Sequence, residues 1–208
     1  VTDATGKLMP GFVAVNNTLT RDMDLVATGH ERVLRARLSD AQYFYRADVK
    51  VPMETWVEKL KGVLFQAKLG SMYDKSLRVS ELAAELARQL GSDVQEVQRA
   101  AMLSRYDLMS QMVYEFPELQ GIMGGHYATA AGERAEVGEA ISHFYRPAFS
   151  GDDIPPSDIG RVLSLADRLD TLVGDTAYVT PEWLAATGNP DAALANADQA
   201  FLLATGYP

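Results

Sequence analysis

The stretch from Arg99 to Val113 constrains the fold more than any other part of the chain. Its apolar residues occur too often for a surface helix, so the sequence predicts a helix that runs through the middle of a domain. A polar block, Ser104-Arg105-Tyr106-Asp107, interrupts the apolar run. Because an unpaired buried charge is strongly destabilising, these side chains must find partners or reach solvent. The block therefore indicates either a functional site or the remains of one.

Helical periodicity continues through most of the chain after residue 24. Apolar residues recur every three to four positions in several further segments, with start or stop signals at their ends. The predicted helices are Leu25–Arg46, Pro52–Lys68, Ser71–Leu90, a helix opened by the capping-box pattern Ser92–Gln95, Glu133–Arg146, Asp158–Val173, a further start at Thr180–Pro181, and Pro190–Ala204. Residues 12–15 form a short β-prone run. The pattern predicts a mainly α fold with a short β-prone N-terminal lead-in.

Composition excludes several classes of protein. The chain contains no cysteine, so it has neither disulfides nor thiolate metal sites. It has no apolar run of the length that a membrane helix needs, and we expect a soluble, cytoplasmic protein without membrane contact. The net charge of −9 argues against a general nucleic-acid binder, but residues 1–68 carry +2, residues 69–120 carry −3 and residues 121–208 carry −8. Any polyanion is therefore expected to meet the N-terminal third.

Three arginines of the first predicted helix, Arg32, Arg35 and Arg37, are candidates for contact with RNA phosphates. Arg32 and Arg35 lie beside the apolar stripe of this helix, whereas Arg37 falls inside it. The structural alternative for Arg37 is a packed stem whose guanidinium meets a carboxylate such as Asp40. The sequence leaves both interpretations open.

Motifs for common catalytic chemistry are absent. The three histidines, His30, His126 and His143, form neither an H-x-x-x-H nor an H-E-x-x-H pattern. The sequence also lacks G-x-S-x-G and a Walker loop, and its glycine-rich "GIMGG" lacks the strand–glycine–helix context of a phosphate loop. We therefore predict no catalytic residue.

Several long strings resemble the β subunit of the bacterial heterotetrameric glycyl-tRNA synthetase. They include "ERVLRARLSDAQ", "SRYDLMSQMVYEFPELQGIMGGHYA", "YRPAFSGDDIP" and "SLADRLDTLVG". The resemblance begins at the lead-in "VTDATGKLMPGFVAVNN" and covers about residues 1–174. It implies a lead-in from a preceding domain over residues 1–24, an HD-domain-like helical bundle over residues 25–174, and a divergent helical tail over residues 175–208.

The resemblance also implies a function. It indicates a fragment of glycine–tRNA ligase, the enzyme that makes glycyl-tRNA for protein synthesis, with the α subunit and tRNA(Gly) as partners. In that family the catalytic site lies on the α subunit, so ATP and Mg²⁺ are expected of the whole enzyme and no cofactor of this fragment. The implied role of this chain is non-catalytic support of tRNA binding.

The HD comparison predicts a lost metal site. Active HD phosphohydrolases bind metal through a His on one helix, a His-Asp pair on the next and a distant Asp. By the resemblance these positions fall on Lys75, on Ser104-Arg105 and on Asp167, so only the last ligand is retained. Because Lys and Arg repel a divalent cation, we expect no metal and no phosphohydrolase activity. We expect Lys75 or Arg105 to pair with Asp167 in a structural cluster; the alternative is that both cations face outward and contact RNA.

Two other functions stay open at this point. One is an active HD-type metal-dependent phosphohydrolase, which the lost ligands disfavour. The other is a purely structural spacer between domains or subunits, which the net negative charge favours. After Gly174 the sequence departs from the family, since an Arg-Arg pair expected there is missing.

Overall fold

The computed structural model describes the backbone of residues 1–187 and the side chains of residues 1–172. Its helices are α1 (Met23–Asp48), α2 (Met53–Lys59), α3 (Met72–Leu90), α4 (Val94–Leu103), α5 (Gln111–Glu115), α6 (Ile122–Ala130), α7 (Ala135–His143) and α8 (Asp158–Thr187). Two short strands, β1 (Leu64–Gln66) and β2 (Gly70–Ser71), form an antiparallel hairpin. Short 3₁₀ turns cover Leu60–Gly62, Tyr106–Met109 and Pro117–Leu119. The predicted mainly α class is confirmed.

The chain divides into two compact units, Val1–Tyr45 and Arg46–Pro208. In the first unit the lead-in carries an isolated bridge between Thr2 and Leu8, closed by a turn at Gly6. The β-prone run at residues 12–15 is not a strand. The division by packing falls inside α1, away from residue 24, and the predicted segments 1–24, 25–174 and 175–208 stay a prediction.

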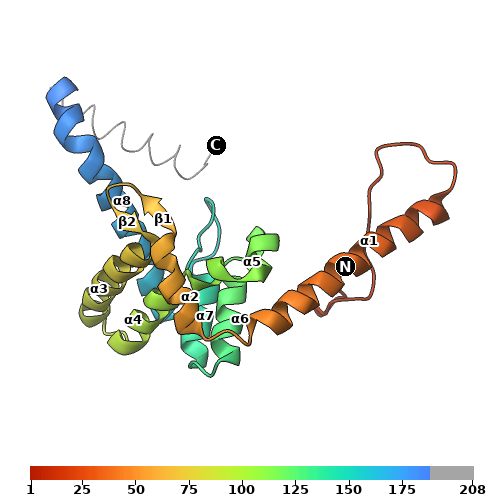
Figure 1. Ribbon diagram of the computed structural model, residues 1–208, viewed down its shortest axis with the longest axis horizontal. Coiled ribbons are helices and arrows are strands. Elements are labelled where there is room, and N and C mark those ends of the chain that lie inside the picture. The colour runs from red at the N-terminus through yellow and green to blue at the C-terminus, as the bar shows by residue number, and fades with distance from the viewer. Residues whose placement is uncertain (188–208) are drawn as a thin grey trace. The chain divides into compact units, whose positions relative to one another are not determined.

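The core of the second unit lies among α3, α4, α6, α7 and α8. Helix α3 packs against α4 and α8, and α7 packs against α4, α6 and α8 (Figure 1). Burial of apolar side chains in this arrangement is the main stabilising contribution. The largest fully buried apolar residues are Leu60, Val79, Val97, Leu103, Tyr106, Val137, Ile141, Phe144 and Leu163. Because α3, α4 and α8 meet in this core, their polar side chains also come together.

Glycines allow α6 and α7 to approach closely. A Cβ atom on Gly125 would collide with the side chain of Ser142 and with the carbonyl oxygen of Gly138. On Gly124 it would lie 2.9 Å from Ile141 and 3.0 Å from Asp107. The "GIMGG" segment therefore serves helix packing, since any side chain at these two positions would push the helices apart.

The stretch Arg99–Val113 is not the single helix that the sequence predicted. Helix α4 ends at Leu103, a 3₁₀ turn covers Tyr106–Met109, and α5 begins afresh at Gln111. The predicted burial is correct, because all four residues of the polar block are buried. Polar groups of the block form hydrogen bonds that compete with continuation of the helix. The Ser104 hydroxyl donates to the carbonyl of Ala101, in the last turn of α4, at 2.8 Å. The Asp107 carboxylate accepts hydrogen bonds from two backbone amides at the start of α6.

The helix predicted over Pro52–Lys68 is also wrong beyond Gly62. Helix α2 ends at Lys59, and the 3₁₀ turn after it ends at Gly62. Strands β1 and β2 form the hairpin that follows. Gly70 adopts a φ of +86°, which allows the chain to reverse before α3 begins. The Met72 amide then donates to the Val63 carbonyl at 2.8 Å. The apolar periodicity continues through residues 63–68, although the structure holds Leu64–Gln66 as an extended strand.

The other predicted helices are present with shifted ends. Helix α3 matches its prediction, with Ser71 and Asp74 in a capping box and Gly91 in the left-handed conformation after its end. Asp93, rather than Ser92, caps α4 by accepting from two amides of its first turn. Helix α7 is shorter than predicted, and α8 runs on to Thr187 through the start predicted at Thr180–Pro181. The helix predicted over residues 190–204 lies outside the described residues.

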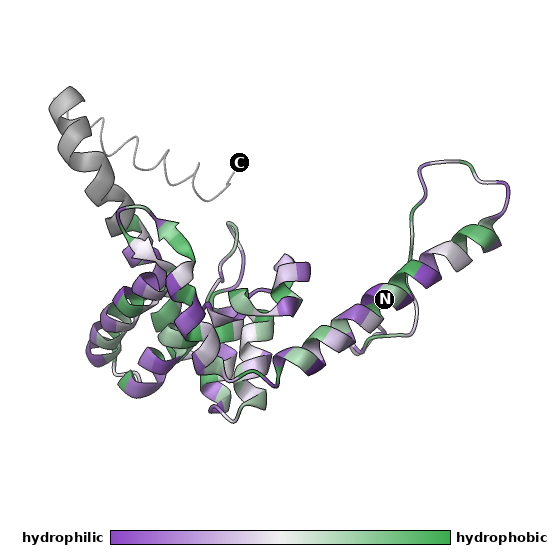
Figure 2. Ribbon diagram, in the orientation of Figure 1, coloured by the Kyte–Doolittle hydropathy of each residue, from purple (hydrophilic) through white to green (hydrophobic). Residues whose placement is uncertain are grey.

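Polar residues recur along α1 between the apolar ones (Figure 2). Among the described residues, no helix is both long and apolar enough to cross a membrane.

Candidate functional site

Three helical elements bring together the residues that the sequence singled out. Lys75 lies in the first turn of α3, Arg105 directly after α4, and Asp167 in the middle of α8. The capping box that starts α3 fixes the position of Lys75 relative to the hairpin before it. Because α3 and α4 both pack on α8, two cations from different parts of the sequence reach one carboxylate.

The Asp167 carboxylate forms ion pairs with both cations, Lys75 and Arg105. Its Oδ1 atom forms a short ion pair with Nη2 of Arg105 and lies 3.4 Å from Nζ of Lys75. The Lys75 and Arg105 side chains are 3% and 6% exposed, so water screens these pairs little. The geometry matches the expected ion-pair cluster, and neither cation faces outward.

Two further charged residues belong to the cluster, and sequence reasoning missed them. Nζ of Lys75 donates to Asp170 Oδ2 at 2.9 Å and to the Thr171 hydroxyl at 2.8 Å. Nε of Arg78 donates to Asp170 Oδ1 at 2.7 Å. The spacing could have identified these residues, because Lys75 and Arg78, like Asp167 and Asp170, are three apart and share a helix face.

Buried carboxylates and aromatic rings complete the environment of the cations. Burial alone would raise the pKa of Asp170, but hydrogen bonds from Arg78 and Lys75 outweigh it and hold this pKa below its ordinary value. Nζ of Lys75 lies 4.6 Å from the centre of the Phe65 ring, and the Arg105 guanidinium lies 5.2 Å from that of Phe144. The cluster is thus paired with acids and packed against rings.

The donor set of this cluster does not suit a divalent metal. Among the described residues, no group of three or more His, Cys, Asp or Glu side chains is close enough to hold a metal ion. Asp167 and Asp170 already bind lysine and arginine, whose fixed positive charge would repel a cation. We therefore derive no metal-dependent step for this chain.

The polar block divides between two roles. The Ser104 hydroxyl accepts a hydrogen bond from Nη1 of Arg105 at 3.3 Å and so belongs to the ion-pair cluster. Asp107 instead accepts the amides of Gly121 and Gly124, at 2.7 and 2.9 Å, at the start of α6. Only half of the block seen in the sequence therefore contributes to the candidate site.

Asp107 titrates in an unusual range. Burial raises the pKa of its carboxyl from 3.8 to about 6, although the Gly121 and Gly124 amides and the nearby Arg105 act in the opposite direction. Its Oδ1 atom has no hydrogen-bond partner, which is consistent with a poorly solvated carboxylate. The folded state therefore binds this proton more tightly than the unfolded state does. The resulting contribution to the free energy of unfolding is fully present below pH 3.8 and is lost as the pH rises through about 6.

We expect Asp107→Asn to remove this pH dependence while keeping an oxygen acceptor for the two amides. Between roughly pH 4 and roughly pH 7, the free energy of unfolding of the variant should rise by about 2–3 kcal/mol relative to that of the parent. Urea denaturation at several pH values measures it. A difference that stays constant with pH would contradict the raised pKa.

The arginines of α1 do not form one surface. All three are exposed. On an α-helix, Arg32 and Arg35 lie roughly 60° apart around the axis, whereas Arg37 lies roughly 140–160° from both. The structure therefore groups Arg32 with Arg35 and leaves Arg37 on another side.

The histidines form no common site. His30 pairs with Asn16 at 3.2 Å, and His143 contacts the Glu139 carbonyl of its own helix at 3.0 Å. His126 is exposed on α6. These separate positions offer no acid–base pair.

Comparisons with known proteins extend over most of the chain. A family model described as glycyl-tRNA synthetase beta subunit matches residues 1–182. The glycine–tRNA ligase beta subunit of Desulforapulum autotrophicum is 54% identical over 176 residues, which cover 83% of this chain and 25% of that protein. The beta subunit of Geobacter sulfurreducens is 54% identical over 175 residues, covering 84% and 26% respectively. The chain thus spans about a quarter of the length of these relatives.

Proposed function

Because the chain belongs to the family of glycyl-tRNA synthetase β subunits, we propose that it is a non-catalytic, HD-like module that supports tRNA binding in glycine–tRNA ligase. In this proposal an α subunit holds the site of glycyl-tRNA formation and binds ATP and Mg²⁺. The chain's own contribution is to help hold tRNA(Gly) during protein synthesis. The assembly would work in the cytoplasm.

The observation that carries the non-catalytic part is that two buried cations neutralise Asp167. By the resemblance, an active HD site would carry a histidine at Lys75 and an aspartate at Arg105, and these two cations both contact Asp167. A fixed ammonium and a fixed guanidinium neutralise this carboxylate without binding a nucleophilic water. The former site then serves as a structural connection between α3, α4 and α8. The alternative, an HD phosphohydrolase, requires bound divalent metal, and metal analysis of the purified chain would detect it.

The tRNA-binding part is supported by the charge of α1. Arg32 and Arg35 are exposed on one side of this helix, in the N-terminal third whose net charge is +2. Guanidinium groups bind phosphate oxygens well because their donors are planar and permanently charged. We propose that this pair provides the phosphate contacts, with Arg37 outside the contact because it lies on another side of the helix.

Binding of tRNA(Gly) to the chain at several salt concentrations tests this proposal. We expect affinity to fall with salt, and the paired substitution Arg32→Ala and Arg35→Ala to reduce the log–log slope by about 2, since each phosphate contact contributes about 1. Arg88→Ala is the matched control, because Arg88 is also an exposed helical arginine but pairs with Glu85. An unchanged slope in the double variant, or no binding at low salt, would favour a purely structural spacer.

A further inference from the structure

The first unit has no core of its own. Within residues 1–45, all of which the structure describes, no residue is buried. Many large apolar side chains there are exposed: Leu8, Met9, Phe12, Val13, Val15, Leu19, Met23, Leu25, Val33, Leu34 and Leu38. Isolated helices and extended segments are marginal in water without tertiary packing. This unit therefore needs a covering layer that residues 1–45 do not themselves provide.

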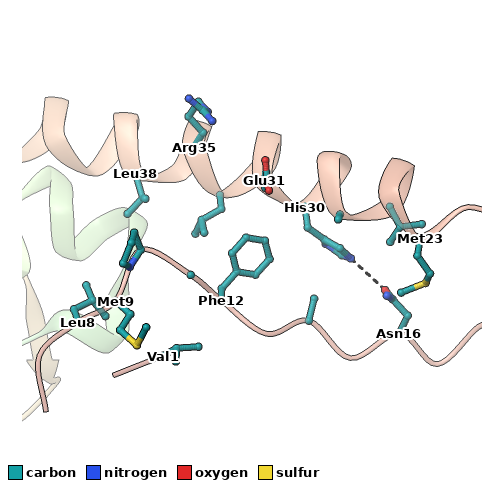
Figure 3. Close-up of a pocket in the computed structure, with 16 residues that line it drawn as sticks. Val1, Leu8, Met9, Phe12, Asn16, Met23, His30, Glu31, Arg35 and Leu38 are labelled. Carbon is teal, nitrogen blue, oxygen red and sulfur yellow. Dashed lines mark hydrogen bonds between the residues drawn. The ribbon is translucent and has the colours of Figure 1, made fainter. Parts of the chain in front are cut away.

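An apolar groove runs between the lead-in and α1 (Figure 3). Its volume is about 950 Å³. Phe12 and Met9 from the lead-in and Leu34 and Leu38 from α1 are among the residues that line it. The wall formed by α1 extends from Met23 to Leu38, which is about 22 Å at 1.5 Å per residue.

The groove offers little to an RNA. Its interior polar pair, His30 and Asn16, is already joined at 3.2 Å. Glu31 and Arg35 are the charged residues that line it, and Figure 3 shows Arg35 directed away from the lead-in. Arg32 lies roughly 160° around the helix from Leu34, so of the proposed phosphate-binding pair only Arg35 borders the groove. An apolar groove beside a helix fits an amphipathic helix, whereas RNA requires cations and stacking platforms.

We propose that this groove holds an amphipathic helix of about four turns from the part of the β-subunit polypeptide that lies outside the matched quarter. The relatives supply the argument, because this chain covers only 25% of the Desulforapulum protein. A first unit without any buried residue is stable only if other parts of such a polypeptide cover it. The groove shares Arg35 with the proposed tRNA contact, but the inference does not depend on that contact.

Hydrogen exchange tests the proposal on two proteins. One is the 208-residue chain, and the other is a chimera in which the matched 83% of this chain replaces the corresponding part of the Desulforapulum β subunit. We expect the α1 amides to exchange about 100-fold more slowly in the chimera, because docking suppresses local opening. Leu34→Asp in the chimera should abolish this protection, whereas Val33→Asp should preserve it. Val33 is 63% exposed and does not line the groove.

Protection of α3 and α4 in both variants would show that the second unit stays folded. Four outcomes would overturn the proposal. Equal α1 exchange in chain and chimera would exclude a covering segment. Protection of the free chain that rises with its concentration would indicate a second copy, protection only with added α subunit would indicate that partner, and protection only with tRNA would indicate RNA.

Discussion

Replacing Asp167 by alanine is expected to lower the free energy of unfolding by about 3–5 kcal/mol, the usual cost of removing one partner from a buried ion pair. Lys75 and Arg105 both contact this carboxylate and are almost fully buried. Without it, Arg105 would keep a cation in a poorly solvated place beside the Ser104 hydroxyl and the Phe144 ring. The midpoint temperature of thermal unfolding should fall by roughly 10 °C in a chain of this size.

Glu85→Ala is the matched control for this substitution. Glu85 also forms an ion pair with an arginine, Arg88, but both of these side chains are more than half exposed. Exposed pairs contribute little, so this variant should unfold almost as the parent does. If Asp167→Ala were as mild as Glu85→Ala, the cluster would have no structural importance, and the proposed replacement of a metal site by an ion-pair cluster would lose its support.

Asp48→Ala is expected to have an effect of similar size for a different reason. The Asp48 carboxylate, 2% exposed, accepts the amides of Gln111 and Met112 at 3.1 and 3.0 Å and the Tyr127 hydroxyl at 2.9 Å. These amides belong to the first turn of α5, where a helix has no acceptor of its own. Losing the acceptor leaves three donors without their partner, and the Met112 amide and the Tyr127 hydroxyl among them are buried. We expect the free energy of unfolding to fall by about 3 kcal/mol or more.

Two variants make the Asp48 experiment specific. Tyr127→Phe removes one of the three donors and should cost about 1 kcal/mol, the net value of one hydrogen bond. Asp40→Ala, at an exposed aspartate of the same helix, should leave stability nearly unchanged. Urea denaturation provides all three values. A loss for Asp48→Ala no greater than that for Tyr127→Phe would contradict a shared role for the carboxylate.

Local signals in the sequence predicted several elements well. The capping residues Ser71 and Asp74 and the terminal Gly91 define α3 within the chain itself, because caps act over three or four residues. The helix predicted over Leu25–Arg46 is also present, as α1. Its apolar stripe is exposed in the structure, however, since periodicity identifies a face that can be buried and does not identify what buries it.

Predictions failed where distant residues decide the backbone. The apolar pattern continued through Pro52–Lys68 and Arg99–Val113, but the helices end early in both. In the second case the Asp107 carboxylate meets amides of Gly121 and Gly124, which no local signal connects to it. Periodicity over a short window cannot show that a polar group has a better partner elsewhere.

The sequence by itself determined the mainly α class and the family. These follow from residue types and their order, which are local facts. Only the tertiary structure decided that both cations turn inward to Asp167 and that Asp170 and Arg78 join them. Pairing across α3, α4 and α8 depends on how helices pack, and packing joins residues about 90 positions apart.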